Sequence, residues 1–239
     1  MHQSSIASSS EFSPEYKGSS PYSAQASKTG LGMITWEAVY RDETLNNRDR
    51  VLGWLQDQVP KKRLDHILRV EQLAIELAWH HQLDVEKAAQ AGLMHDLAKC
   101  FKPQTLLHMA EAEGLTLDPV ELTNPHLLHA AVGAIVARDT FQVKDVDILN
   151  AIRHHTLGEP EMSLLSCVVF LADTLEPGRG DTPELNHLRR VCRDDLHRAV
   201  WLTCDYSLTD LVSRQHLVHP QAVQTRNWAL QASQRSRRV

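Results

Sequence analysis

The sequence lacks the features that would place the protein in a membrane, outside the cell or on nucleic acid. No apolar run approaches the roughly 18–20 residues that a membrane span needs, and residues 1–30 have no hydrophobic signal core. No long basic run precedes the final SQRSRRV, and the formal net charge is −5. The four cysteines, at positions 100, 167, 192 and 204, have no Cys-x-x-Cys spacing, which is typical of thiols in a reducing compartment. We therefore expect a cytoplasmic protein with neither a nucleic-acid nor a membrane partner.

Patterns typical of β-strands are also scarce, and we predict an all-α fold. The run VVF at 168–170 could form a strand, but no second run exists to pair with it. Pro60 stops a first helix, Asp84 caps a later one, and the apolar stretch 163–175 predicts the most buried helix. The periodicity predicts helices over 46–59, 62–81, 84–99, 124–138, 144–155 and 163–175, another that opens at Pro103, and a long helical region from Pro183 to about 230.

The N-terminal segment differs from the rest of the chain. Residues 1–40 are rich in serine and poor in aliphatic residues over most of their length. Such a segment cannot bury enough apolar surface to offset the entropy of ordering it, so we expect it to be disordered.

An adjacent His95–Asp96 pair stands in the apolar, alanine-rich stretch AGLMHDLAK, where little room is left for a solvated face. A buried charge must be paired or bound to metal, so this pair indicates a metal site, although a lone His–Asp pair is usually structural. Further candidate ligands sit in or at the end of other helical stretches, namely His66, His129, His155 and Asp173. Several helices that each contribute a histidine or a carboxylate can build a site for one or two metal ions. Mixed ligands of this kind suit iron, manganese or zinc better than calcium.

Other residues near these candidates could bind a phosphate. Lys99 could neutralise a departing phosphate oxygen, or it could simply favour a helix C-terminus. Arg179, in the turn PGRG, could clamp a phosphate or be solvated. Thr156 and Gly158 follow a helix end and would allow a close approach of the backbone to phosphate, and His154 is a candidate substrate contact.

The ordered set His66, His95–Asp96, His129, His155 and Asp173 resembles the HD superfamily of metal-dependent phosphohydrolases. The segments HLLHAAVGAIVA, AIRHHTLG and LADTLEPGRG are similar to its YqeK-type branch, the symmetrical diadenosine-tetraphosphate hydrolases, in which a His-Thr-x-Gly motif precedes Ala-Asp and Glu-Pro-x-Arg. The likeness covers roughly residues 60–180. It implies an HD-domain helical bundle over 45–180, with a C-terminal helical extension over 183–230 outside it.

The resemblance also implies ligand sets and an activity. One metal ion would take His66, His95, Asp96 and Asp173, and a second would take His129 and His155, with Asp96 as the bridge. We prefer His129 over His126 because small residues surround it, and His155 over His154 because it aligns with His-Thr-x-Gly. Catalytic roles then fall to Asp96, Lys99 and Arg179. The implied reaction is hydrolysis of a dinucleoside polyphosphate to two nucleoside diphosphates. It would use two metal ions, and iron is the preferred metal before manganese or zinc.

Two alternatives remain open at this point. The chain could be a nucleotide phosphohydrolase or phosphodiesterase of another HD branch, although the Gly-Tyr-Pro motif of cyclic-di-GMP phosphodiesterases is absent. It could also be a non-catalytic HD module in which metals hold the fold and the C-terminal helices bind a partner. The presence of all six candidate ligands favours an enzyme. The sequence does not decide whether the chain works alone or as a homodimer.

Overall fold

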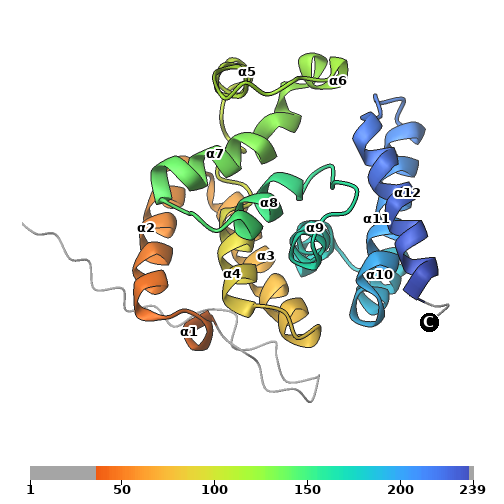
Figure 1. The fold of residues 1–239 in the computed structure, drawn as a ribbon, viewed down its shortest axis with the longest axis horizontal. Coiled ribbons are helices and arrows are strands. Elements are labelled where there is room, and N and C mark those ends of the chain that lie inside the picture. Colours follow the sequence, from red (N-terminus) through yellow and green to blue (C-terminus); the bar gives the residue numbers. More distant parts are fainter. Residues whose placement is uncertain (1–35, 237–239) are drawn as a thin grey trace, which may run out of the picture. The chain divides into compact units, whose positions relative to one another are not determined.

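Residues 36–236, which the computed structural model describes, form helices joined by turns, and no β-strand lies in that range (Figure 1). The predicted all-α fold is confirmed. The α-helices are α1 (Trp36–Val39), α2 (Asp42–Gln58), α3 (Lys61–His80), α4 (Val85–Met94), α5 (Pro103–Ala112), α6 (Pro119–Thr123), α7 (His129–Phe141), α8 (Val146–His154), α9 (Leu164–Leu175), α10 (Pro183–Asp194), α11 (Leu196–Ser213) and α12 (Pro220–Ser236). Two short 3-10 helices, η2 (Pro125–Leu128) and η3 (Pro177–Arg179), lie between them.

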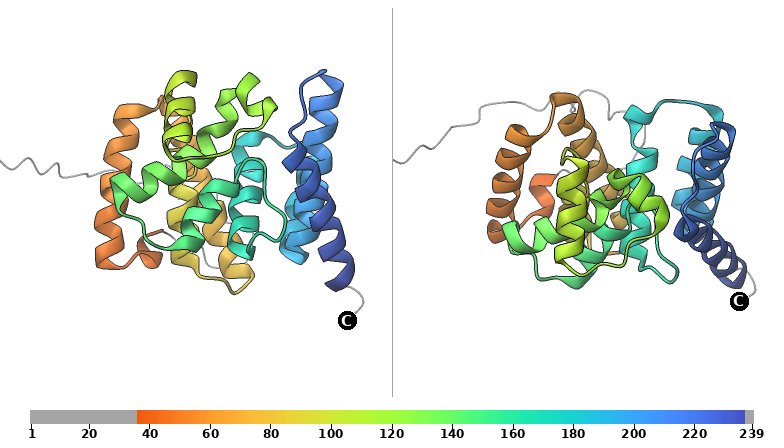
Figure 2. Two further views of the ribbon diagram at one scale, coloured as in Figure 1. Left: turned by 45° about the horizontal axis from the view of Figure 1, so that its top comes forward. Right: turned by 90° about the horizontal axis from the view of Figure 1, so that it is seen from above.

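Helix α9 lies at the centre of the described region. It contacts α3, α4, α8, α10 and α11, and two further views show it between the helices on either side (Figure 2). Its residues from Leu165 to Ala172 are all buried, which confirms the prediction made for this apolar stretch. None of the described helices has the length and apolar character needed to cross a bilayer.

Local sequence signals account for several of the helix ends. Pro60 lies at the junction of α2 and α3, the Asp84 carboxylate accepts a hydrogen bond from Lys87 N at 3.0 Å, and the Ser163 hydroxyl accepts one from Ser166 N at 3.2 Å. The Asp84 and Ser163 side chains satisfy backbone donors that a helix start leaves unpaired. The predicted positions of these starts are confirmed.

The helix predicted to run from 84 to 99 ends earlier, at Met94. Residues 95–100 instead form successive tight turns, in which Leu97 N donates to Met94 O and Lys99 N to Asp96 O. Bonds between residues three apart are tighter than those of an α-helix. Both His95 and Asp96 are thereby buried rather than spread around a helix surface.

Ordered structure also begins before residue 40, where the sequence led us to place the end of the disordered segment. Residues 1–35 lie outside the described residues, but α1 follows them and Tyr40 is buried against Ile75 and Ala89. The Tyr40 hydroxyl donates to Glu71 Oε1 at 2.8 Å, and Glu71 also pairs with Arg48. A buried tyrosine contributes apolar contact area and needs a partner for its hydroxyl, and Tyr40 has both here.

Candidate metal centre

Six side chains from five different segments converge beside α9. His66 lies on α3, His95 and Asp96 in the turns after α4, His129 at the start of α7, His155 just after α8, and Asp173 near the end of α9. All except Asp173 are buried, and the Asp173 side chain is 21% exposed. The structure therefore brings together every residue that the sequence nominated as a metal ligand.

Asp96 lies between two pairs of histidines. Its Oδ2 atom is 3.4 Å from His95 Nε2 and 3.9 Å from His66 Nε2. Its Oδ1 atom is 3.4 Å from His129 Nε2 and 3.7 Å from His155 Nε2. Each carboxylate oxygen thus faces a different histidine pair, which is the arrangement that a carboxylate bridging two ions requires.

Asp173 completes the first of these two groups. Its Oδ1 atom lies 3.0 Å from His66 Nε2 and 3.9 Å from His95 Nε2. One ligand atom from each of these three residues falls within 4.8 Å of the others, and the same holds for His95, Asp96 and His155. Spacings of this size suit atoms that share an ion at about 2.0–2.3 Å.

The second ring nitrogen of each histidine orients its ring. In three of them Nδ1 donates to a main-chain carbonyl three residues earlier, as His95 does to Gly92 O at 2.7 Å. His66 Nδ1 donates instead to Glu176 Oε1, at 3.0 Å. These bonds place the Nδ1 proton and leave the Nε2 lone pairs directed at the centre.

The donor set fits a cation at the first group. The Nε2 atoms of His66 and His95 are buried and have no hydrogen-bond partner in the described structure. His66 Nε2 nevertheless lies only 3.0 Å from Asp173 Oδ1, so a lone pair faces a carboxylate oxygen. Burying a polar atom without a partner costs free energy, and a metal ion bound by His66 Nε2 and Asp173 Oδ1 would give both atoms a partner.

The electrostatics of the site favour the protonation states that metal ligands need at His129, His155 and Asp96, whereas at His95 burial works to lower the pKa but Asp96 and its neighbours raise it. Burial and then the neighbouring His155 lower the pKa of His129 to about 3, and burial and then His95 lower the pKa of His155 to about 4. Both imidazoles are therefore neutral at pH 7. Burial works to raise the pKa of the Asp96 carboxyl, but His95 and other neighbours hold that pKa well below its ordinary value. Asp96 is ionised and able to bind a cation.

Both of the predicted phosphate-binding cations, Lys99 and Arg179, reach this centre. Lys99 Nζ lies 3.0 Å from His129 Nε2, and burial lowers the pKa of Lys99, with Arg63 and Arg179 acting in the same direction. Arg179 Nε donates to Asp173 O at 2.8 Å, and its Nη2 pairs with the Asp173 carboxylate. Arg179 is therefore attached to a candidate ligand rather than free in its turn.

The sequence reasoning missed three residues around the centre. Arg63 Nη1 pairs with Asp96 Oδ2 at 2.9 Å, with 32% of the Arg63 side chain exposed. Glu176 holds His66 and is itself paired with Arg69. A signal was present, because Arg63, His66 and Arg69 recur at every third position of one helix, and Glu176 stands one turn beyond the last candidate ligand.

Besides Arg179, three residues were predicted to bind substrate, and they lie in different surroundings. Thr156 Oγ1 is 3.1 Å from His129 Nε2 and 3.0 Å from His155 Nε2, at the second group. His154 Nδ1 lies 3.2 Å from Ser166 Oγ, on the side of α9. Gly158 packs against α12, and its N–H donates to His154 O at 2.9 Å. Thr156 is thus at the centre, whereas Gly158 has a packing role that explains the glycine without a substrate.

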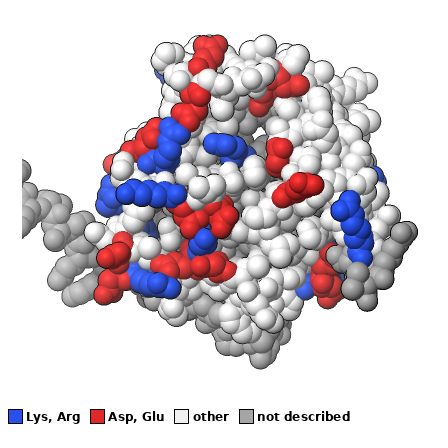
Figure 3. Space-filling model, viewed as in Figure 1, with Lys and Arg blue, Asp and Glu red and all other residues white. Residues whose placement is uncertain are grey.

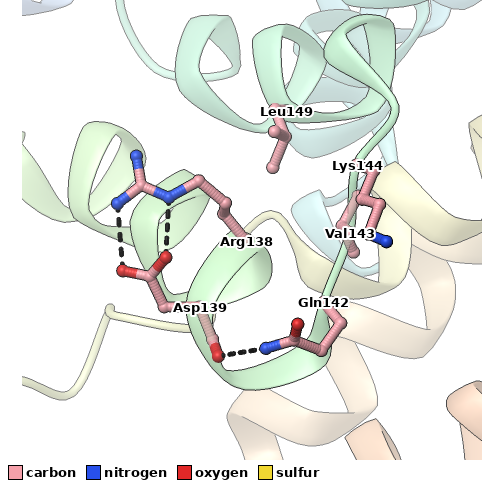
Figure 4. A pocket seen from close by; sticks show the side chains of 6 residues that line it. All are labelled: Arg138, Asp139, Gln142, Val143, Lys144 and Leu149. Carbon is pink, nitrogen blue, oxygen red and sulfur yellow. Dashed lines mark hydrogen bonds and ion pairs between the residues drawn. The ribbon is translucent and has the colours of Figure 1, made fainter.

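Among residues 36–236, no other group of histidines, cysteines and carboxylates has the spacing of a metal site. Acidic and basic side chains are interleaved on the face that Figure 3 shows. A depression lies at the connection between α7 and α8. In Figure 4 its Arg138 side chain points toward Asp139, and Lys144 lies on the opposite side. Arg138 also pairs with Glu113, with a 2.9 Å distance from Nη2 to Oε2. The depression contains none of the candidate ligands.

Comparison with known proteins yields relatives that span most of the chain. Residues 63–178 match the HD domain. The Bacillus subtilis (strain 168) protein "Bis(5'-nucleosyl)-tetraphosphatase, symmetrical" is 35% identical over 189 residues, which are 78% of this chain and 100% of that protein. A protein of the same name from Halalkalibacterium halodurans is 33% identical over 77% of this chain and 97% of its own length.

A solved structure agrees with these sequence matches. The predicted HD superfamily hydrolase from Clostridium acetobutylicum superimposes with a TM-score of 0.74 at 32% identity, over 77% of this chain and 97% of that one. The chain belongs to the HD family of hydrolases. Within that family it groups with the symmetrical bis(5'-nucleosyl)-tetraphosphatases, as the resemblance read from the sequence implied.

Proposed function

We propose that this protein hydrolyses dinucleoside tetraphosphates such as diadenosine tetraphosphate at the central phosphoanhydride bond, giving two nucleoside diphosphates. The relatives named above support the substrate, since their names describe a symmetrical tetraphosphatase. The observation that carries the reaction class is the position of Asp96, whose two oxygens each face a separate histidine pair. That geometry suits two adjacent metal ions.

Two metal ions would be held by the six converging side chains. The first would take His66, His95, Asp96 and Asp173, and the second would take Asp96, His129 and His155. A metal pair of this kind supplies a nucleophilic water at neutral pH and stabilises charge on the phosphoryl group. We propose iron as the metal, with manganese and zinc as the alternatives that histidine and carboxylate ligands also suit.

Three cations of the chain and one hydroxyl group would stabilise the phosphate groups on both sides of the scissile bond. Arg63 and Arg179 contact the carboxylates of the first group, whereas Lys99 and Thr156 contact the histidines of the second. A substrate with anionic phosphates on either side of the bond that breaks would match this distribution. Preorganised donors aimed at developing charge contribute roughly 3–4 kcal/mol each to transition-state stabilisation.

We also propose a cytoplasmic location. All four cysteines are free thiols in the structure, and Cys167, Cys192 and Cys204 are buried and keep raised pKa values because of that burial. Free thiols persist in a reducing compartment, which supports this proposal.

Product analysis tests the proposed reaction. The purified protein, loaded anaerobically with ferrous iron, is incubated with diadenosine tetraphosphate, and the nucleotides are separated by anion exchange. Symmetrical cleavage gives ADP as the only product. Formation of AMP with ATP would contradict it, and so would intact substrate after loading with each of the three metals.

A pair of charge-neutralising variants tests the phosphate-binding assignment. Arg63→Gln should raise the Michaelis constant or lower turnover, because it removes a cation at the first group. Lys62→Gln is the matched control, since Lys62 is the preceding residue of the same helix and is exposed. Equal kinetics for the two variants would remove Arg63 from the proposed site.

A further inference from the structure

Helix α12 lies beyond the HD match yet holds the loop that follows His155. The Thr225 hydroxyl donates to Leu157 O at 3.0 Å. The Gln221 amide donates to Gly158 O and, at 2.9 Å, to the Glu159 carboxylate. Figures 1 and 2 show this loop, between α8 and α9, extending toward the C-terminal helices. Hydrogen bonds to three acceptors on the loop therefore connect it to α12, whose residues lie more than 60 positions later in the sequence.

The contact is too close to be incidental. Gly158 has a φ of +67°, and a Cβ atom placed on it would lie 2.3 Å from Thr225 Cγ2. No side chain other than hydrogen fits there, and the left-handed backbone conformation also favours glycine. Thr225 is completely buried, so its hydroxyl needs the carbonyl that it binds. The helix and the loop have complementary shapes as well as matched hydrogen bonds.

The same short loop begins at the metal centre. His155 and Thr156 are its first residues, and the Thr156 hydroxyl lies 3.1 Å from His129 Nε2 and 3.0 Å from His155 Nε2. Because Leu157 is the next residue, the bond from Thr225 to its carbonyl restrains the Leu157–Gly158 peptide, which directly follows the residue after Thr156 in the chain. A change in that restraint would move a hydroxyl that stands about 3 Å from both imidazoles.

We propose that Thr225, assisted by Gln221, is a positioning residue for the second metal position. It acts through the backbone of residues 156–158 and touches neither metal nor substrate. The C-terminal extension is then a working part of the site rather than an appended partner-binding module. This inference rests on the proposed function for its effect on turnover, but its effect on metal affinity is independent of the substrate.

Two substitutions at Thr225 separate the hydrogen bond from the packing. Thr225→Val keeps the shape and removes the hydroxyl, whereas Thr225→Ser keeps the hydroxyl and removes the methyl group. Thr209→Val is the control, because Thr209 on α11 also donates its hydroxyl to a main-chain carbonyl, at 2.7 Å, but lies on the exposed surface. Each full-length variant is freed of metal and titrated with Mn²⁺ alone, and kcat and KM for diadenosine tetraphosphate are measured separately.

Thr225→Val should weaken the second Mn²⁺ equivalent and lower kcat, each by about tenfold, which is the size of effect expected from a residue behind the ligands. Thr225→Ser and Thr209→Val should stay close to wild type in both measurements. Wild-type affinity and kcat in Thr225→Val would overturn the proposal, and so would equal losses in the valine and serine variants.

Two further outcomes are covered by the same design. If Thr225→Val does not fold, Gln221→Ala is compared with Gln224→Ala, which alters an exposed glutamine three residues along the same helix. Loss of Mn²⁺ affinity in the first alone supports the proposal, and equal affinities overturn it. If the wild-type protein cleaves no dinucleotide, the proposed function fails, whereas the Mn²⁺ titrations still decide the role of Thr225.

Discussion

Replacing His155 by alanine should remove the second metal ion, whereas replacing the adjacent His154 should leave both ions bound. The two histidines face different surroundings. His155 Nε2 lies 3.0 Å from His129 Nε2 and 3.7 Å from Asp96 Oδ1, and its side chain is fully buried. His154 Nδ1 lies 3.2 Å from Ser166 Oγ and makes no contact with the candidate ligands among the interactions of the described residues. The pair is a matched comparison within one segment.

The expected magnitudes differ for the same reason. His154→Ala removes one neutral hydrogen bond, worth about 1 kcal/mol. For a domain of this size the melting temperature should then fall by roughly 2–4 °C. His155→Ala removes a ligand itself, so the loss of turnover should exceed the roughly 10–100-fold effect of changes behind the ligands.

Elemental analysis of iron-loaded protein, together with turnover, decides between the two residues. His154→Ala should retain the wild-type metal content and His155→Ala should lose about half of it, given a two-metal site. The opposite result would refute the reasoning, because it would mean that the His-Thr-x-Gly motif is aligned one residue too late. Wild-type metal content and turnover in both variants would remove the second metal position altogether.

Three other changes have defined outcomes. Glu176→Gln should weaken metal binding by about 10–100-fold, because the carboxylate holds the ring of the ligand His66, and a titration with Mn²⁺ would detect it. Lys99→Met should lower turnover at unchanged metal content, whereas Arg179→Gln should change both, since Arg179 pairs with a ligand carboxylate; elemental analysis beside kinetics separates them. Burial and then Arg153 lower the pKa of His154 to about 4, so the unfolded chain takes up its proton first as the pH falls below about 6.5, and stability is lost between there and pH 4. Between those pH values the free energy of unfolding of His154→Ala should fall by about 3 kcal/mol less than that of the wild type, because each pH unit contributes up to about 1.4 kcal/mol. Denaturant titrations at pH 7 and pH 4 measure this fall, and an equal fall in both proteins would contradict the assignment.

The helices and the identity of the candidate ligands were predictable because their signals are local. Pro60, Asp84 and Ser163 act on backbone groups within one turn of themselves, and the period of the apolar residues reports the buried face. The order of histidines and carboxylates along the chain likewise pointed to the six residues that converge. Each of these features is readable without knowledge of where distant segments lie.

Only the tertiary structure decided how those residues face one another. The division of Asp96 between two histidine pairs depends on the tight turns after Met94, which the helical pattern did not reveal. The spacing of Arg63 and Glu176 placed them near candidate ligands, but only the packing of their segments showed that Arg63 pairs with Asp96 and Glu176 with His66. Gly158 suggested a phosphate contact in the sequence, but it adjoins a threonine 67 positions later. Contacts between residues so far apart in the sequence produce no periodic pattern that could predict them. They depend on how whole helices pack against one another, and no single helix determines them.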